Sequence, residues 1–218
     1  MSSERRDDVG TGSAAGDGDA IPLRGDSKCA ACDGGTETSK SAAAVGGTAA
    51  LSAALRRHKP EAVINFAALA YVGESNAEPT LYYRNNVAGM VSLLEAMRAH
   101  GVGNIVFSSS CATYGVPQRL PIVEDMPQSP INPYGQTKLM GERILRDACS
   151  FEGLGAVALR YFNVFGPRQN PGSPYSAVLS RFITAFLRGE RPTIYGDGEQ
   201  SRDFTFVDNV VEANLLAC

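Results

Sequence analysis

Histidine is scarce in this sequence, neither sign of charge is in excess, and no hydrophobic run is long. The 218 residues include two histidines, and 20 Lys and Arg against 23 Asp and Glu give a net charge of −3. A slightly acidic chain lacks the basic patch of a nucleic-acid-binding protein. The longest nearly apolar run, 62–72, is too short to cross a bilayer, and the first residues, MSSERRDD, lack the apolar region of a secretory signal. We therefore expect a cytoplasmic protein without a nucleic-acid or membrane partner.

Cysteines are also few. The chain has five, an odd number without the spacing of a disulfide framework, which fits a reducing compartment. Cys29 and Cys32 form a C-x-x-C pair, but a zinc site would need a second pair of ligands. The two histidines, His58 and His100, are far apart in sequence. We expect two small thiols in a loop and no bound metal, with metal or redox chemistry as the alternative.

The composition divides the chain into two parts. A hydrophobic fraction of 44% is enough for a folded core. Residues 1–50, however, are rich in Gly, Ala, Ser, Asp and Thr, and only Ile21 and Leu23 stand out as large apolar residues. Such a segment buries too little surface to offset its ordering entropy. We expect residues 1–50 to be a disordered head and residues 51–218 to form the domain.

Helical and extended patterns alternate beyond residue 51. Apolar residues at helical spacing predict helices, and short apolar runs predict buried strands. The expected elements are a helix ending at 58, a strand at 62–67, a helix at 85–100, a strand at 104–108, a helix at 134–149, a strand at 156–161, and helices at 176–188 and 207–217. This order predicts an α/β fold with a parallel sheet. Ligands bind at the carboxyl ends of such strands, so the loops after Phe66, Phe107 and Tyr161 should lie along one rim.

One constellation of residues points to proton-transfer chemistry. Tyr134 and Lys138 have the i, i+4 spacing that places them on one helix face. An ammonium beside a phenol favours the phenolate, so we expect a lowered pKa for Tyr134 and a tyrosine able to accept a proton. Alone, this pair would more often be a solvated surface pair. Here it follows a buried strand and the serine run Ser108 to Ser110, whose hydroxyls could position a substrate oxygen.

Several long motifs in the same order resemble a known family. The matching stretches are VINFAALAYVGES, YYRNNVAGM, IVFSSSCATYG, NPYGQTKLMGE, RYFNVFGPRQNP and PTIYGDGEQSRDFTFVDNV. From about residue 51 the chain resembles the NAD-dependent epimerase/dehydratase family of extended short-chain dehydrogenase/reductases. Within it, the chain is most similar to UDP-hexose 4-epimerases, particularly those acting on UDP-N-acetylhexosamines or UDP-hexuronic acids. The resemblance implies a Rossmann-like parallel sheet with helices on both faces, and transient oxidation of the sugar at C4 by bound NAD.

The resemblance also implies a role for individual residues. Tyr134 would be the catalytic base, Lys138 its pKa partner and a ligand of the nicotinamide ribose, and Ser110 the hydrogen-bond partner of the sugar 4-hydroxyl. The residues that would border NAD are Phe66, Ala67, Ala68, Asn86, Ser108 and Tyr161, with Tyr134 and Lys138. The residues that would bind the UDP-sugar are Asn163 at the phosphate, Ala177 and Val178 near the uracil, and Arg202 at the diphosphate, beside Ser110.

The ends of the chain depart from the family pattern. The family begins with a strand and a G-x-x-G-x-x-G turn that holds the pyrophosphate. Residues 10–15, GTGSAA, are a formal G-x-G-x-x-A without the flanking strand and helix, and residues 23–26, LRGD, resemble the end of the family's third strand at an unusual distance from Phe66. The last helix stops at Cys218, before the family's substrate lobe. We therefore expect a partial domain, lacking a complete first Gly-rich unit and C-terminal lobe.

Three alternatives remain open. The chain could be a catalytically dead fragment, a pseudoenzyme of this family, or a sister nucleotide-sugar dehydratase or decarboxylase. Residues 110–115, SCATYG, lack the acid of the family's 4,6-dehydratases, which favours an epimerase. The family's subunits pair through helices that match 85–100 and 134–149, so we expect a possible homodimer. The apolar residues of the first of these helices, Met90, Leu93, Leu94 and Met97, could face a partner or belong to the core.

Overall fold

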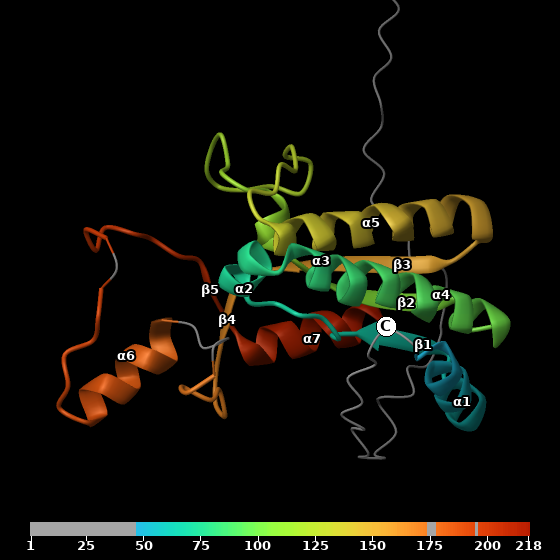
Figure 1. Ribbon diagram of the computed structural model, residues 1–218, viewed down its shortest axis with the longest axis horizontal. Helices are drawn as coiled ribbons and strands as arrows, with labels where there is room; N and C mark the ends of the chain where they lie inside the picture. The colour runs from blue at the N-terminus through green and yellow to red at the C-terminus, as the bar shows by residue number, and fades with distance from the viewer. Residues whose placement is uncertain (1–46, 174–177, 195) are drawn as a thin grey trace, which may run out of the picture.

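The structure, a computed structural model, describes residues 47–173, 178–194 and 196–218. Helices and strands alternate through most of this part of the chain (Figure 1). In chain order the elements are α1 (Thr48–His58), β1 (Ala62–Asn65), α2 (Val72–Ala77), α3 (Pro79–Tyr82), the π-helix η1 (Tyr83–Ala88), α4 (Gly89–Ala99), β2 (Asn104–Ser110), the 3₁₀ turn η2 (Cys111–Thr113), α5 (Pro133–Glu152), β3 (Gly155–Tyr161), β4 (Asn163–Phe165), α6 (Val178–Leu187), β5 (Phe204–Phe206) and α7 (Val207–Ala217).

Strands β1, β2 and β3 form one parallel sheet in that spatial order. Phe107 of β2 pairs with Asn65 of β1 on one side and with Ala158 of β3 on the other. Parallel strands need helical crossovers, which α4 and α5 provide. All three carboxyl ends therefore lie at the same rim of the sheet, as the sequence predicts.

Helices cover both faces of this sheet. Ile105 and Phe107 of β2 are buried in a core with residues of α1, α4 and α5, and Ala156 of β3 joins them. Successive strand residues point to opposite faces, so Tyr161 faces away from α5. Its hydroxyl accepts a hydrogen bond of 2.7 Å from Asn214 of α7, which runs on the other side of the sheet from α5 (Figure 1). This layering agrees with the predicted Rossmann-like α/β fold.

A second, smaller unit lies beyond the rim. β4 and β5 form a two-stranded parallel sheet, and Figure 1 shows α6 on the outer side of it, away from the main sheet. A groove of about 390 Å³ separates this sheet from α6, lined on one side by Phe165 and Phe206 and on the other by Leu179 and Ile183.

Several boundaries differ from those predicted. The strand expected at 104–108 continues to Ser110, so all three serines belong to the sheet. The strand expected at 62–67 ends at Asn65. The helix expected at 85–100 begins earlier as the π-helical turn η1 and continues as α4, and α2 and α3 were not predicted because both are too short to show a period.

The core interpretation of helix α4 is confirmed. Met90, Leu93 and Met97 are buried in the core cluster, and Leu94 packs against its edge. Five of the predicted features lie wholly or mostly outside the described residues: the disordered head at 1–50, the 10–15 and 23–26 segments, the Cys29/Cys32 pair and Ala177. The described end of the head differs from the prediction, because residues 48–50 already belong to α1. In the part of the chain that the structure describes, no helix combines the length and the apolar character needed to span a membrane, and no three His, Cys, Asp or Glu side chains are grouped as metal ligands would be.

Candidate active site

The first turn of α5 is fixed against the end of β2. Asn132 caps the helix by accepting a hydrogen bond of 2.8 Å from the Gly135 amide, and Pro133 occupies the first turn. A Cβ atom at Gly135 would lie 2.6 Å from the carbonyl oxygen of Ala112, and one at Gly141 would lie 2.8 Å from the Phe107 ring. Glycine at these two positions therefore allows α5 to lie directly on β2 and on the turn that follows it.

This close approach brings Tyr134 and Lys138 to the serine run. Lys138 is 3% exposed, and its ammonium donates a hydrogen bond of 2.6 Å to the Ser108 carbonyl oxygen. The same nitrogen lies 4.9 Å from the centre of the Phe107 ring and 5.9 Å from that of the Tyr134 ring. The Ser110 hydroxyl, at the end of β2, accepts a hydrogen bond of 3.2 Å from the Ala112 amide. Lys138 is thus buried against the sheet and Tyr134 is half-buried beside it, so the solvated surface-pair interpretation is wrong.

The pKa of Tyr134 corrects one prediction. We expected Lys138 to lower it, but burial raises the pKa of the Tyr134 phenol, and the Ser110 hydroxyl only partly opposes this increase. Burial also lowers the pKa of Lys138 to about 8. The desolvation of both groups outweighs the attraction that sequence spacing suggested, because neither side chain is solvated well enough to hold its charge freely.

A buried ion pair lies one helical turn further along α5, and sequence reasoning missed it. Glu142 accepts hydrogen bonds from Arg160 at 2.7, 3.0 and 3.2 Å, and from the Ser109 hydroxyl at 2.5 Å. Gln128 also donates to it, at 2.9 Å. These hydrogen bonds lower the pKa of Glu142 against the opposing effect of burial. The i, i+4 spacing from Lys138 could have identified Glu142, whereas nothing in the sequence pairs it with Arg160.

Asn86 connects the loop after β1 to α5. Its side-chain oxygen accepts from the Leu69 amide at 2.9 Å, and its NH₂ group donates to the Leu69 carbonyl at 2.9 Å and to Thr137 Oγ1 at 3.0 Å. Thr137 in turn donates to the Tyr134 carbonyl at 2.8 Å. The Asn85 side chain also donates to the Asn86 side-chain oxygen, at 3.0 Å. Both the oxygen and the NH₂ group of Asn86 therefore make hydrogen bonds within the protein. Its predicted place beside a cofactor stays a prediction.

The other predicted cofactor residues lie along the rim. Phe66 is 59% exposed at the end of β1 and is followed by the exposed Ala67 and the half-buried Ala68. Tyr161 ends β3, where burial raises the pKa of its phenol and the bond from Asn214 partly opposes the increase. A large apolar side chain left exposed at the carboxyl end of a parallel strand is typical of a ligand-binding rim.

Apart from Ser110 of β2, the predicted substrate residues that the structure describes come from the smaller unit. The side chain of Asn163 donates to the Asp203 carbonyl at 3.0 Å and so joins β4 to the segment before β5. Arg202 is exposed. Burial raises the pKa of the Cys111 thiol, in the turn after β2, and the Arg202 charge opposes that increase. Val178 begins α6, 39% exposed. Arg202 therefore lies in the segment before β5, while Val178 stands on a separate element.

Comparison with known proteins identifies the family. The model of the NAD dependent epimerase/dehydratase family matches residues 26–218. The chain belongs to this family. Among curated relatives, the UDP-glucose 4-epimerase of Lactobacillus helveticus is 42% identical over 179 residues, which are 77% of this chain and 54% of that protein. The UDP-glucose 4-epimerase of Rhizobium meliloti is 50% identical over 173 residues, 77% of this chain and 53% of the relative.

Solved structures agree with this family. The UDP-glucose 4-epimerase of Thermotoga maritima, solved with UDP-glucose, is 39% identical with a TM-score of 0.75, covering 78% of this chain and 55% of that one. The UDP-N-acetylglucosamine 4-epimerase of Methanobrevibacter ruminantium, solved in complex with UDP-N-acetylmuramic acid, is 44% identical with a TM-score of 0.73. The match covers 77% of this chain and 53% of that one. The chain therefore spans about half the length of the family members it matches.

Proposed function

We propose that this chain is the core of a nucleotide-sugar 4-epimerase in which Tyr134 is the catalytic base. The observation that carries the proposal is the burial of Lys138 against the serine run, where its ammonium bonds to the Ser108 carbonyl and lies 5.9 Å from the centre of the half-buried Tyr134 ring. Several similar proteins are UDP-glucose 4-epimerases, which supports a UDP-sugar as substrate.

The described residues fit the nicotinamide half of an NAD site. Among them the Lys138 ammonium makes one hydrogen bond, to Ser108, so two of its three N–H groups are available to ribose hydroxyls. Phe66, Ala67 and Ala68 would border the cofactor at the end of β1, with Asn86 positioning that loop. Ser108, two residues before the end of β2, and Tyr161, at the end of β3, would lie beside them. When bound, NAD would supply a temporary acceptor for the hydride at C4 of the sugar.

The chain's own residues would handle the proton and hold the substrate. The Tyr134 oxygen would accept the proton of the sugar 4-hydroxyl, and Ser110 would hydrogen-bond the same hydroxyl and orient it. A charged Lys138 one turn away would favour the phenolate that forms. Arg202 would neutralise the diphosphate with a forked guanidinium, Asn163 would contact it, and Ala177 and Val178 would border the uracil.

A dehydratase is the less favoured alternative. Elimination of water requires an acid beside the reacting sugar, and the turn after Ser110 begins Cys111-Ala112. The carboxylate nearest to Tyr134 along α5 is Glu142, which is engaged by Arg160. Neither position offers a free acid, which supports epimerisation.

The test is interconversion of UDP-glucose and UDP-galactose by the purified chain with added NAD. Tyr134→Phe removes only the phenolic hydroxyl, and loss of a positioned base should lower kcat by about 10²–10⁴-fold. Tyr83→Phe, the same change in η1, is the matched control. Activity that survives in Tyr134→Phe would refute the assignment of the base. A folded chain that binds neither NAD nor UDP would favour a catalytically dead fragment or a pseudoenzyme.

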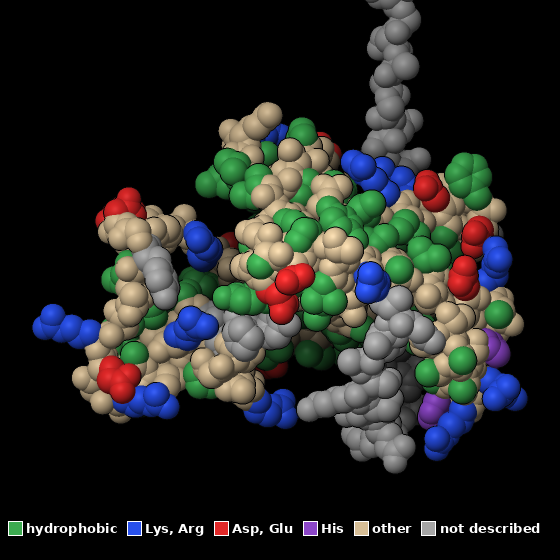
Figure 2. All heavy atoms as spheres, viewed as in Figure 1, with side chains coloured by type: hydrophobic (Ala, Val, Ile, Leu, Met, Phe, Trp, Pro, Cys, Tyr) green, Lys and Arg blue, Asp and Glu red, His purple; other side chains and the backbone are tan. Residues whose placement is uncertain are grey.

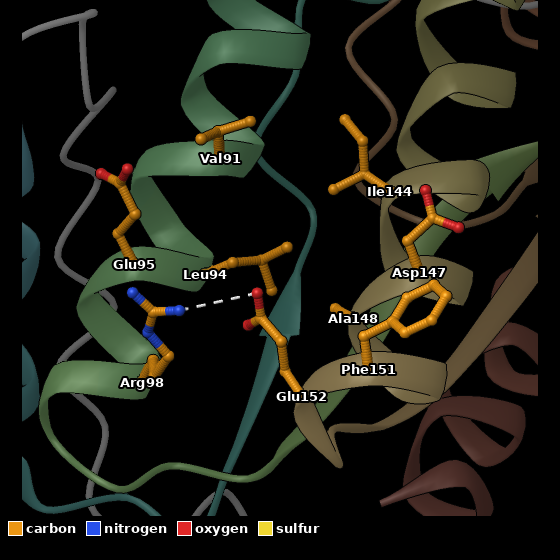
Figure 3. A pocket seen from close by; sticks show the side chains of 9 residues that line it. All are labelled: Val91, Leu94, Glu95, Arg98, Ile144, Asp147, Ala148, Phe151 and Glu152. Atoms are coloured by element: carbon orange, nitrogen blue, oxygen red, sulfur yellow. Dashed lines mark ion pairs between the residues drawn. The ribbon is translucent and has the colours of Figure 1, made fainter.

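We further propose that α4 and α5 pair two copies of the chain. A groove of about 340 Å³ lies between these helices, with Val91 and Leu94 facing Ile144 and Phe151 across it (Figure 3). Hydrophobic side chains gather over the same helices on the surface in Figure 2. Phe151 is 86% exposed, so Phe151→Glu should convert a dimer to a monomer in sedimentation analysis. Phe186→Glu on α6, at 65% exposure, is the control, and a monomeric parent chain would refute the proposal.

A further inference from the structure

Thr137 is the least exposed polar side chain of α5, at 1%. It lies on the same helix as Tyr134 and Lys138 but has no part in the proposed proton transfer. Its hydroxyl donates to the Tyr134 carbonyl at 2.8 Å, and its oxygen accepts from the Asn86 side chain at 3.0 Å. The first bond stays within α5, whereas the second reaches a residue 51 positions earlier in the chain.

Asn86 in turn pairs with the backbone of Leu69 in both directions. Its oxygen accepts from the Leu69 amide and its NH₂ group donates to the Leu69 carbonyl, each at 2.9 Å. An NH₂ group has two protons, so one is used at Leu69 and the second at Thr137. The Thr137 oxygen therefore accepts the bond that joins the loop after β1, through Asn86, to α5.

The two segments joined in this way are the two sides of the proposed nicotinamide site. On one side is the loop of residues 66–69, which begins with the exposed Phe66 and is tied to β1 by a bond of 3.0 Å from the Ala67 amide to the Asn65 side chain. On the other side is α5 with the Lys138 ammonium. A ligand that contacts both sides binds more tightly when their spacing is set beforehand, because it does not have to order the loop.

We propose that Thr137 is a positioning residue that, through Asn86, holds the loop of residues 66–69 in a fixed position relative to α5. The inference rests on the proposed function, because that loop would border the cofactor of the reaction. A threonine that served only its own helix would bond to the Tyr134 carbonyl and leave the loop unaffected. The two roles differ at the Leu69 amide, which bonds to Asn86 and not to Thr137.

The experiment measures hydrogen exchange of the Leu69 amide by NMR in the full chain labelled with nitrogen-15 leucine. Leu69→Met identifies the signal. Thr137→Val removes the hydroxyl, keeps the branched shape and leaves one Asn86 N–H without its acceptor. Exchange at Leu69 should become about fivefold faster, the factor that corresponds to one hydrogen bond of about 1 kcal/mol. Thr137→Ser keeps the hydroxyl and should retain the parent rate.

Two controls separate this effect from a general loss of stability. Thr184→Val in α6 also removes a hydroxyl that donates to a carbonyl of its own helix, that of Ser180 at 2.8 Å, and should leave Leu69 unchanged. The amide of the buried Leu145 in α5 reports on the rest of the fold in the same spectra. Unchanged exchange at Leu69 in folded Thr137→Val would overturn the proposal, and so would an acceleration shared equally by Leu145.

Two further variants test the route through Asn86 and cover a failure to fold. Asn86→Ala removes the acceptor of the Leu69 amide, so adding Thr137→Val to it should produce no further acceleration. Effects that add fully would contradict the route. If Thr137→Val does not fold, Thr137→Cys replaces the hydroxyl by a weaker acceptor of similar size and should accelerate exchange at Leu69 by a smaller factor. Parent-like exchange in Thr137→Cys would then overturn the proposal.

Calorimetric titration with NAD and with UDP measures the consequence for ligand binding. Thr137→Val should weaken NAD binding about fivefold, because the loop must then be ordered on binding. It should leave the affinity for UDP unchanged, since the proposed UDP contacts come from the smaller unit. Equal losses for both ligands would count against a role at the nicotinamide site. A parent chain that binds neither ligand would refute the proposed function alone, because exchange at Leu69 decides by itself whether Thr137 holds the loop.

Discussion

Lys138 should make the fold less stable at neutral pH than at alkaline pH. The change to test is Lys138→Met, which keeps the length of the side chain and removes the ammonium. Lys138 is 3% exposed, and burial lowers its pKa from 10.5 to about 8. Since one pKa unit is worth about 1.4 kcal/mol, holding this charge in the folded chain costs about 3 kcal/mol below pH 8.

The sign follows from the two protonation states. Below about pH 8 the lysine is charged in both the folded and unfolded chain, so the full cost is present. Above pH 10.5 it is neutral in both, and the cost is absent. Between these values the stability of the parent should rise with pH relative to that of Lys138→Met. Loss of the hydrogen bond to Ser108 shifts the two curves by about 1 kcal/mol at every pH and does not alter this trend.

The assay is urea denaturation of parent and variant at a series of pH values between 7 and 10.5. The difference in unfolding free energy should change by about 3 kcal/mol across this range, in favour of the parent at high pH. Lys59→Met, the same change at an exposed position after α1, should give two parallel curves. A difference between parent and Lys138→Met that stays constant with pH would refute the reasoning.

Two further predictions concern the start of α5. Gly135→Ala should destabilise the chain and lower any epimerase activity, because its Cβ would lie 2.6 Å from the Ala112 carbonyl oxygen. The control is Gly89→Ala in α4, which should stabilise the chain by about 0.5–1 kcal/mol because nothing lies within 4 Å of its Cβ. Equal changes in the thermal unfolding midpoint for the two variants would contradict this prediction. Asn132→Ala removes the helix cap and should cost about 1 kcal/mol, with a negligible loss arguing against the cap.

The parts of the fold that follow from local patterns were predictable. The buried strand NIVFS, the helix after Pro133 and the last helix at 207–217 all occur in the structure, because hydrophobic periodicity and proline position act within a few residues. The short helices α2 and α3 were not predicted. They depend on contacts such as the Tyr82 hydroxyl with the Tyr71 carbonyl, 2.7 Å apart and eleven residues distant in sequence.

The candidate site was predictable in its residues but not in its energetics. Spacing placed Tyr134 and Lys138 on one helix face, and this is correct. Spacing could not show that glycines at 135 and 141 would let α5 lie on β2 closely enough to desolvate both groups. Partners distant in sequence, such as Glu142 and Arg160, were equally hidden, because sheet register and not sequence distance decides which side chains meet.

The four-residue spacing of Tyr134, Lys138 and Glu142 on α5 limits which changes in chain length this region can tolerate. Each residue advances an α-helix by about 100°, so Tyr134, Lys138 and Glu142 share a face only while they stay four positions apart. Inserting or deleting one residue between 134 and 142 would rotate at least one of them off the serines. Substitution of the outward-facing residues leaves this spacing intact. Across relatives, this segment should therefore vary in composition while keeping its length.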